Sequence, residues 1–258
     1  MRRNIEIRKQ QTYIKTVYPL KIDESYIFIR EDLKYLIFSK IVCFFVIIFG
    51  RTFFKLIGTH KTIGKSNIKD LNNKGFISIS NHCHFLDAIL TSTTLRKKTI
   101  WFSSLQRNFE TPYIRHFVRI LKGFPIPNNP FGLMQIMNPI IKTINNGNVV
   151  NFNPETELWH LHQGIGNFKS GAFYLAHKAN CPIIPVIHLF KPKTFFGIMI
   201  SKNILNITSV IGNPIYPSNP CNLNNKYVDV KSVKIMTEQA HEIMTTVMNK
   251  YKTENNIL

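Results

Sequence analysis

The sequence has few acidic residues and lacks the features of several protein classes. Of 258 residues only 14 are Asp or Glu, against 33 Lys or Arg, so the formal net charge is +19. The four cysteines lie far apart and form no Cys-x-x-Cys pair. This excludes a zinc ribbon, a thioredoxin-type site and a disulfide scaffold, and predicts free thiols in a reducing compartment. With 44% hydrophobic residues, the chain is neither disordered nor collagen-like and can bury the core of one domain.

A long apolar run is also absent near the N-terminus. A spanning helix needs roughly 20 apolar residues, whereas the uninterrupted part, Ile41–Phe49, has nine, and basic residues punctuate the surrounding segment 33–57. We therefore expect a helix that lies in the membrane interface, with lysines reaching the head groups. A single span over residues 35–54 and a buried core helix are the alternatives. The apolar stretch begins too far from Met1 for a cleavable signal peptide.

The basic excess predicts an anionic partner. Residues 1–74 hold 15 Lys or Arg and 6 Asp or Glu, a net charge of +9, and each basic residue near an anionic leaflet contributes about 1 kcal/mol of attraction. We expect binding to an anionic membrane surface, at the cytoplasmic face of the cell membrane, as a peripheral or monotopic protein. Nucleic acid would also explain the charge, but no RNP, KH or zinc-finger pattern is present, so we expect no nucleic-acid partner. The joint abundance of Lys, Asn and Ile also fits a drift in base composition.

From residue 75 onward, short β-rich runs alternate with segments of helical periodicity. Strands are expected at residues 75–80, 98–103, 148–152, 182–190 and 204–212, and helices at 88–95, 112–121, 131–144, 171–180 and 231–251. This alternation predicts an α/β fold with a mixed, largely parallel sheet flanked by helices. We divide the chain into a basic N-terminal segment with a membrane-interface helix, residues 1–60, and an α/β domain, residues 61–258.

The residues best suited to chemistry follow the first of these strands, in Asn81-His82-Cys83-His84-Phe85-Leu86-Asp87. His82 and Asp87 would lie about 140° apart on one continuous helix, so they meet only across a strand-to-helix turn. There Asp87 can accept a hydrogen bond from one imidazole nitrogen and make the other a stronger base for a substrate hydroxyl. A histidine that only caps the helix is the alternative. We expect no metal site, since neighbouring side chains of an extended segment face opposite sides.

Further blocks follow in a set order: Lys122–Pro127, Asn153–Glu155, Phe168–Ala172 and Pro182–Val186. Together with Asn81-His82-x4-Asp87 they resemble the glycerolipid acyltransferase family, best known for making phosphatidic acid from 1-acylglycerol-3-phosphate. The resemblance covers roughly residues 75–190 and implies acyl transfer from a thioester of coenzyme A or acyl carrier protein to a lysolipid hydroxyl, without a further cofactor. It implies that His82 is the general base, that Asp87 orients it, and that no acyl-enzyme forms. Backbone N–H groups near the turn are the expected oxyanion donors.

Two arginines of the family pattern are missing. The second block ends in Pro127-Asn128-Asn129 without its arginine, and the family's Pro-Glu-Gly-Thr-Arg reads Pro154-Glu155-Thr156-Glu157-Leu158. In the family both arginines are associated with the acceptor phosphate, and Asn or Leu cannot copy the two-pronged contact of a guanidinium.

Other side chains are therefore expected to contact substrate: Asn81, Glu155, Lys122, Arg119 and Lys169, with Arg115 on the same helix face as Arg119. The alternatives are an acceptor without a phosphomonoester, such as a glycolipid, and a protein that binds lipid without catalysis.

Overall fold

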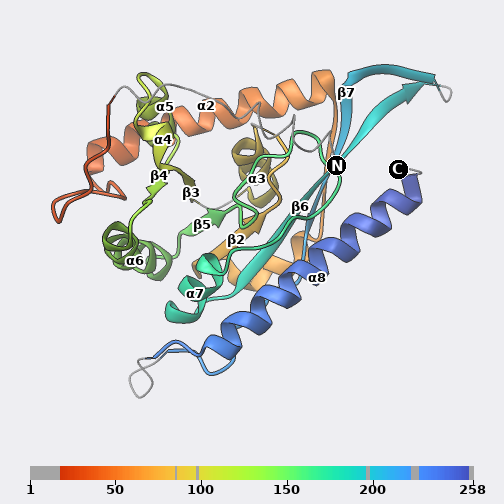
Figure 1. The fold of residues 1–258 in the computed structure, drawn as a ribbon. Coiled ribbons are helices and arrows are strands. Elements are labelled where there is room, and N and C mark those ends of the chain that lie inside the picture. Colours follow the sequence, from red (N-terminus) through yellow and green to blue (C-terminus); the bar gives the residue numbers. More distant parts are fainter. Residues whose placement is uncertain (1–17, 85, 97–98, 196–197, 222–226, 256–258) are drawn as a thin grey trace, which may run out of the picture.

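The structure is a computed structural model that describes residues 18–84, 86–96, 99–195, 198–221 and 227–255. Its centre is a seven-stranded sheet in the order β1-β7-β6-β2-β5-β3-β4 (Figure 1). Every neighbouring pair is parallel except β6 and β7, which are antiparallel. The prediction of an α/β fold with a mixed, largely parallel sheet is therefore confirmed.

Each predicted segment overlaps an element of the expected type. The strands are β1 (Gly58–Ile63), β2 (Phe76–Ser80), β3 (Ile100–Leu105), β4 (Gly123–Ile126), β5 (Val149–Phe152), β6 (Ile183–Phe195) and β7 (Ile198–Ile211). The helices are α2 (Leu33–Ile57), the 3-10 helix η1 (Lys65–Leu71), α3 (Asp87–Leu95), α4 (Gln106–Phe109), α5 (Ile114–Ile120), α6 (Pro130–Asn145), α7 (Gly171–Lys178) and α8 (Val230–Asn255). Residues 1–17, 85 and 97–98, which the predictions included, lie outside the described residues.

Helices cover both faces of the sheet because successive strand residues point to opposite sides. On one face, Ile77 and Ile79 of β2 pack in a cluster with residues of α6, α7 and α8. On the other face, Phe76 joins a cluster that includes Leu95 of α3 and Leu71 of η1. The long helix α8 lays one apolar stripe against the sheet, at the three- and four-residue spacing of a helix: Val233, Met236, Ala240, Met244 and Met248.

The two strands that the sequence patterns missed, β1 and β4, are the edge strands of the sheet. β4 reads Gly-Phe-Pro-Ile, and the proline removes a backbone donor, which an edge strand tolerates. β1 is parallel to β7, with His60 opposite Ile207. The boundary expected between residues 60 and 61 therefore falls inside a strand of the common sheet.

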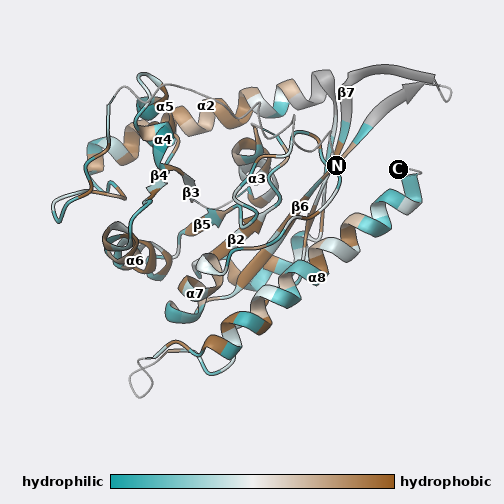
Figure 2. Cartoon of the chain, viewed as in Figure 1, coloured by the Kyte–Doolittle hydropathy of each residue, from teal (hydrophilic) through white to brown (hydrophobic). Residues whose placement is uncertain are grey.

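Helix α2 packs against the domain along its length through one face and exposes an apolar face. Tyr35, Ser39 and Gly50 are buried, and the Ser39 hydroxyl donates to the carbonyl of Ile120 at 2.6 Å. The opposite face exposes Ile37, Ile41 and Ile48. Phe38, Phe44, Phe45, Phe49 and Phe53 are exposed as well, and the last four line cavities between α2 and α3. Figure 2 shows α2 as a mostly hydrophobic helix. Within the described residues, Leu33–Phe53 is the one helical stretch long and apolar enough to cross a membrane.

Candidate active site

The turn between β2 and α3 brings His82 and Asp87 together. Nδ1 of His82 lies 2.9 Å from Oδ2 of Asp87, and the same oxygen accepts the backbone N–H groups of Cys83 at 2.9 Å and His84 at 3.1 Å. The Asp87 side chain is buried, whereas that of His82 is 31% exposed. The carboxylate is thus held by its own turn, and the imidazole it orients is open to a ligand.

The hydrogen bond to Asp87 determines the tautomer of the neutral His82 ring. A carboxylate only accepts, so Nδ1 of neutral His82 carries the proton and Nε2 keeps a free lone pair. The N–H groups of Cys83 and His84 are already donated to Asp87. These two N–H groups are therefore used within the turn, and the expectation that backbone N–H groups near the turn serve as oxyanion donors, which named no residue, stays a prediction.

Asn81 lies behind the dyad and is almost completely buried. Its Nδ2 donates to the carbonyl of His188 at 2.9 Å, and its Oδ1 accepts the backbone N–H of His188 at 2.8 Å. The amide therefore joins the end of β2 to β6 in the manner of a backbone pair. Asn81 therefore supports the turn structurally, and both the Nδ2 and the Oδ1 atom of its side chain are hydrogen-bonded.

Glu155 follows β5 and lies beside the dyad. The adjacent strand ends are joined by Asn153, whose Nδ2 donates to the carbonyl of Ser80 at 3.1 Å. Oε2 of the buried Glu155 accepts the backbone N–H of Gly166 at 3.0 Å. Burial raises the pKa of Glu155, and the backbone N–H groups of Gly166 and His82 oppose this rise. The carboxylate thus closes the loop that runs from residue 155 to residue 166.

That loop packs onto the turn of the dyad. The N–H of Trp159 donates to the carbonyl of His82 at 3.0 Å, and the N–H of Leu161 donates to that of Cys83 at 2.7 Å. The rings of His84 and His160 come within 5.6 Å, centroid to centroid. The sequence pattern gave no signal for this pair beyond the histidines themselves. Within the described residues no group of three or more His, Cys, Asp or Glu side chains is placed to hold a metal ion.

Thr156 occupies the position of the family's glycine and keeps the backbone shape that glycine favours. Its φ is 63°, in the left-handed region that a β-branched residue rarely adopts. Its N–H donates to the carbonyl of Asn153 at 3.1 Å. The loop therefore retains the turn of the third block although the glycine is gone.

The structure separates the predicted cations. Arg119 donates to the carbonyl of Ile27 at 3.1 Å and to the Tyr26 hydroxyl, and so holds the segment before α2. Arg115 stacks over Tyr18. The Lys169 side chain is exposed, and the backbone N–H of Lys169 donates to the carbonyl of Pro154 at 2.9 Å. Of these three, only Lys169 is tied to the block that carries Glu155.

Lys122 lies away from the dyad. Across the sheet, Lys122 lies opposite Trp101 of β3, which pairs with Val150 of β5, and Val150 pairs with Ile77 of β2. Lys122 is therefore at the same height along the strands as Ile77. His82 is five residues further along, so the two Cα atoms are separated by about 16 Å along the strands and about 14 Å across three strand spacings. The structure therefore does not bring Lys122 to the reacting groups.

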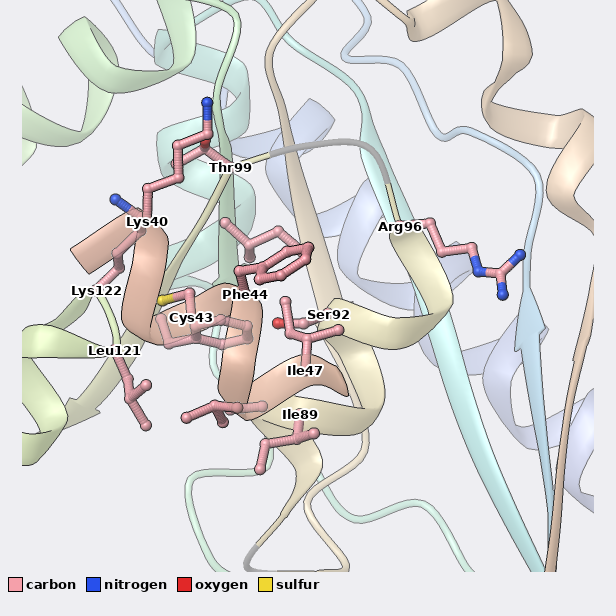
Figure 3. A pocket seen from close by; sticks show the side chains of 14 residues that line it. Lys40, Cys43, Phe44, Ile47, Ile89, Ser92, Arg96, Thr99, Leu121 and Lys122 are labelled. Carbon is pink, nitrogen blue, oxygen red and sulfur yellow. The ribbon is translucent and has the colours of Figure 1, made fainter. Parts of the chain in front are cut away.

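Two neighbouring cavities lie between α2 and α3. The more apolar one, of about 490 Å³, is lined by seven residues: Phe45, Val46, Phe49, Gly50, Phe53, Leu86 and Ile89. Leu86 directly precedes Asp87, so this cavity begins beside the turn that carries His82 and Asp87. The second, of about 340 Å³, shares Val46 and Ile89 and continues along α3 toward Lys122 (Figure 3). Sequence reasoning missed this groove, although the α2 residues recur at helical spacing.

The comparisons with known proteins fit this geometry. The family model for acyltransferases matches residues 61–189. This chain belongs to the acyltransferase family. Among solved structures, its fold is similar to the crystal structure of PlsC, the 1-acyl-sn-glycerophosphate (LPA) acyltransferase of Thermotoga maritima, with a TM-score of 0.57 and 18% sequence identity. The match covers 83% of this chain and 81% of that chain. No curated protein matches the chain.

These matches confirm the resemblance to glycerolipid acyltransferases that the motif order indicated. They support an acyl donor and a lipid acceptor as the substrates.

Proposed function

We propose that this acyltransferase works at a membrane surface and moves a fatty acyl group from an acyl thioester to a hydroxyl of a lysophospholipid or related glycerolipid. The observation that carries the proposal is the 2.9 Å hydrogen bond between His82 and the buried Asp87. It leaves Nε2 of an accessible imidazole as the base, with no Ser or Cys nucleophile required.

The reaction then proceeds in one transfer. Nε2 of His82 takes the proton of the acceptor hydroxyl as its oxygen attacks the thioester carbonyl carbon. The carbonyl oxygen becomes an oxyanion, and Asp87 stabilises the imidazolium that has formed. When the intermediate collapses, the C–S bond breaks and the imidazolium returns its proton to the leaving thiolate. The products are the ester and the free thiol, so protons balance and no acyl-enzyme is needed.

The apolar cavity between α2 and α3 is the proposed site of the acyl chain. It starts at Leu86, next to Asp87, and its walls are aliphatic and aromatic. Because α2 forms one wall and also exposes an apolar face, a chain can enter from the lipid side. Coenzyme A and acyl carrier protein both present the thioester that this reaction requires.

The position of α2 supports attachment in the membrane interface. A helix that spans a bilayer is surrounded by lipid, whereas α2 lies along the domain, with Ser39 and Gly50 buried and Ile41 and Ile48 exposed. Such a helix can sink its outer face into the head-group region while the domain stays outside. Basic residues such as Lys40 and Arg51 on the same helix fit an anionic surface. We propose the cytoplasmic face as the location.

Acceptor recognition is proposed to use the cation that stays near the dyad. Lys169 is held beside Pro154 and Glu155 and can contact an anionic head group, whereas Arg119 and Lys122 are engaged elsewhere. Asn81 and Glu155 are proposed to position the turn and its loop. The exposed Glu157 stands where the family has threonine. It favours, as the second candidate, an acceptor without a phosphate, such as a glycolipid.

A screen of lysolipid acceptors with a labelled acyl thioester tests both candidates. Lysophosphatidic acid is compared with neutral and glycosylated lysolipids, using the native chain and His82→Ala. We expect transfer to at least one lysolipid, and a loss of about 10²–10⁴-fold in rate for the variant. A folded His82→Ala protein with the native rate would refute the base mechanism. The absence of transfer to every acceptor would favour lipid binding without catalysis.

A further inference from the structure

The second cavity between α2 and α3 differs from the first in its charge. Its wall is built from α2, α3, the start of β3 and the residues before β4. It includes the cations Lys40, Lys122 and Arg96, and no Asp or Glu among the described residues lines it. Figure 3 shows Lys40 and Lys122 together at one side of the cavity, while the Arg96 side chain extends away from it. We call this space the cationic cavity.

Lys122 is an unusual wall residue because it is only 7% exposed. Its ammonium lies over the ring of Trp101 at 5.0 Å from the centroid. Within the described residues no carboxylate forms an ion pair with it. Burial lowers the pKa of Lys122, and the charge of Lys40 lowers it further.

The thiol of Cys43 does not neutralise these charges. Burial raises the pKa of the Cys43 thiol, which also lines the cavity, so it remains neutral. A buried ammonium with a second lysine nearby and no anion is costly unless a ligand supplies the opposite charge. The wall also includes the polar residues Ser92 and Thr99, and its apolar part, with Phe44, Ile47 and Ile89, leads away from the lysines.

We propose that the cationic cavity binds a single-chain anionic amphiphile, with its carboxylate or phosphate at Lys40 and Lys122 and its chain along Phe44, Ile47 and Ile89. The volume of about 340 Å³ is in the range of small-ligand pockets. The head group would lie far from His82, by the same strand registers that separate Lys122 from the dyad. This site is therefore distinct from the acceptor site proposed above, and a fatty acid and a monoalkyl phosphate are its two candidate ligands.

Binding can be measured without acyl transfer, so the outcome does not depend on the proposed enzyme activity. The chain has two tryptophans, and a Trp159→Phe background leaves Trp101, under Lys122, as the reporter. Dodecanoate, dodecyl phosphate and dodecanol are titrated below micelle formation, and the emission of Trp101 is followed. We expect one or both anions to shift the emission and to bind at least about tenfold more tightly than dodecanol, because a charge-assisted contact is lost with the alcohol.

Variants then locate the head group. Lys122→Met and Lys40→Met are each expected to lower the affinity for the anion by about tenfold and to leave dodecanol binding unchanged. Lys34→Met removes the same charge from an exposed position on α2 and should change neither affinity. The Lys40 side chain is solvent-exposed, so Lys40→Met should fold. This variant therefore tests the proposal even where Lys122→Met fails to fold.

The proposal is overturned by equal binding of dodecanol and both anions, or by folded Lys40→Met and Lys122→Met proteins that bind the anions as the native chain does. Binding of the phosphate alone would assign a phospholipid-type head group, and binding of the carboxylate alone would assign a fatty acid.

Discussion

His188 links the stability of the fold to pH through a buried network. The side chain is fully buried, with Nδ1 at 2.9 Å from the Ser209 hydroxyl and Nε2 at 3.0 Å from the Thr91 hydroxyl. Burial lowers the pKa of His188 from 6.5 to about 4. As the pH falls below 6.5 the unfolded chain takes up a proton at this residue, while the folded chain does so only near pH 4. The folded state therefore loses stability between these two values.

The size of this loss follows from the shift in pKa. Two and a half pKa units correspond to about 3 kcal/mol in the free energy of unfolding, of which about 2 kcal/mol is lost by pH 5. This is a large share of the roughly 5–15 kcal/mol of a typical domain. This loss also bears on the turn that carries His82 and Asp87, because the Asn81 side chain is hydrogen-bonded to both backbone groups of His188.

Urea unfolding at pH 7, 6 and 5, followed by far-ultraviolet circular dichroism, measures the effect. His188→Gln removes the titrating group but keeps an amide that can bond the two hydroxyls. We expect the native chain to lose about 2 kcal/mol more than this variant between pH 7 and pH 5. The control His116→Gln changes an exposed histidine and should keep the native slope. Equal slopes for the native chain and His188→Gln would show that His188 is not kept neutral by burial.

Three further substitutions test the site and its surroundings. Asp87→Asn should lower the transfer rate by about 10²–10⁴-fold, because the amide no longer fixes the Nδ1–H form of His82; a rate within threefold of native would contradict this. Thr156→Gly should raise the free energy of unfolding by up to about 1 kcal/mol, since glycine adopts φ 63° without strain. Lower stability of this variant would show that the threonine side chain makes a needed contact. Ile41→Glu, at an exposed position of α2 that lines neither cavity, should weaken binding to anionic vesicles by about tenfold, whereas unchanged binding would place the outer face of α2 away from lipid.

The sequence predicted the central elements because their signals are local. β2 and β5 are short apolar runs bounded by Gly or Asn, and α8 carries its apolar stripe at helical spacing. β1 and β4 escaped prediction because an edge strand is half solvated and its pairing comes from a distant segment. Gly58–Ile63 pairs with β7, almost 150 positions later in the chain, and no local pattern records that partner.

The same distinction applies to the site. The spacing of His82 and Asp87 already required a strand-to-helix turn, and the turn is there. Lys122 belongs to a sequence block of the family pattern, but this did not predict that it would lie near His82. It precedes β4, which is three strands from β2 in the sheet. Residue spacing does not specify the order of the strands or the path of a long loop. It therefore could not predict the hydrogen bonds between Asn81 and His188 or the contact between His84 and His160.

The third block, Pro154-Glu155-Thr156-Glu157-Leu158, can be considered for two separate tasks, of which this chain keeps one. One task is the shape of the loop: Glu155 binds the N–H of Gly166, the residue at position 156 keeps a left-handed backbone, and the loop donates to the carbonyls of His82 and Cys83. This task survives the loss of the glycine, because a backbone conformation that is braced on both sides can carry the strain of a threonine. The other task, which the family resemblance implies, is the charge that an arginine offers to the acceptor phosphate, and Leu158 carries no such charge. Because the proposed base and its loop are intact while this charge is gone, we expect the change at this block to affect which head group is accepted rather than how the hydroxyl is activated. Restoring Leu158→Arg should therefore alter the ratio of rates for phosphorylated and neutral lysolipids, and a uniform change for both would contradict the separation.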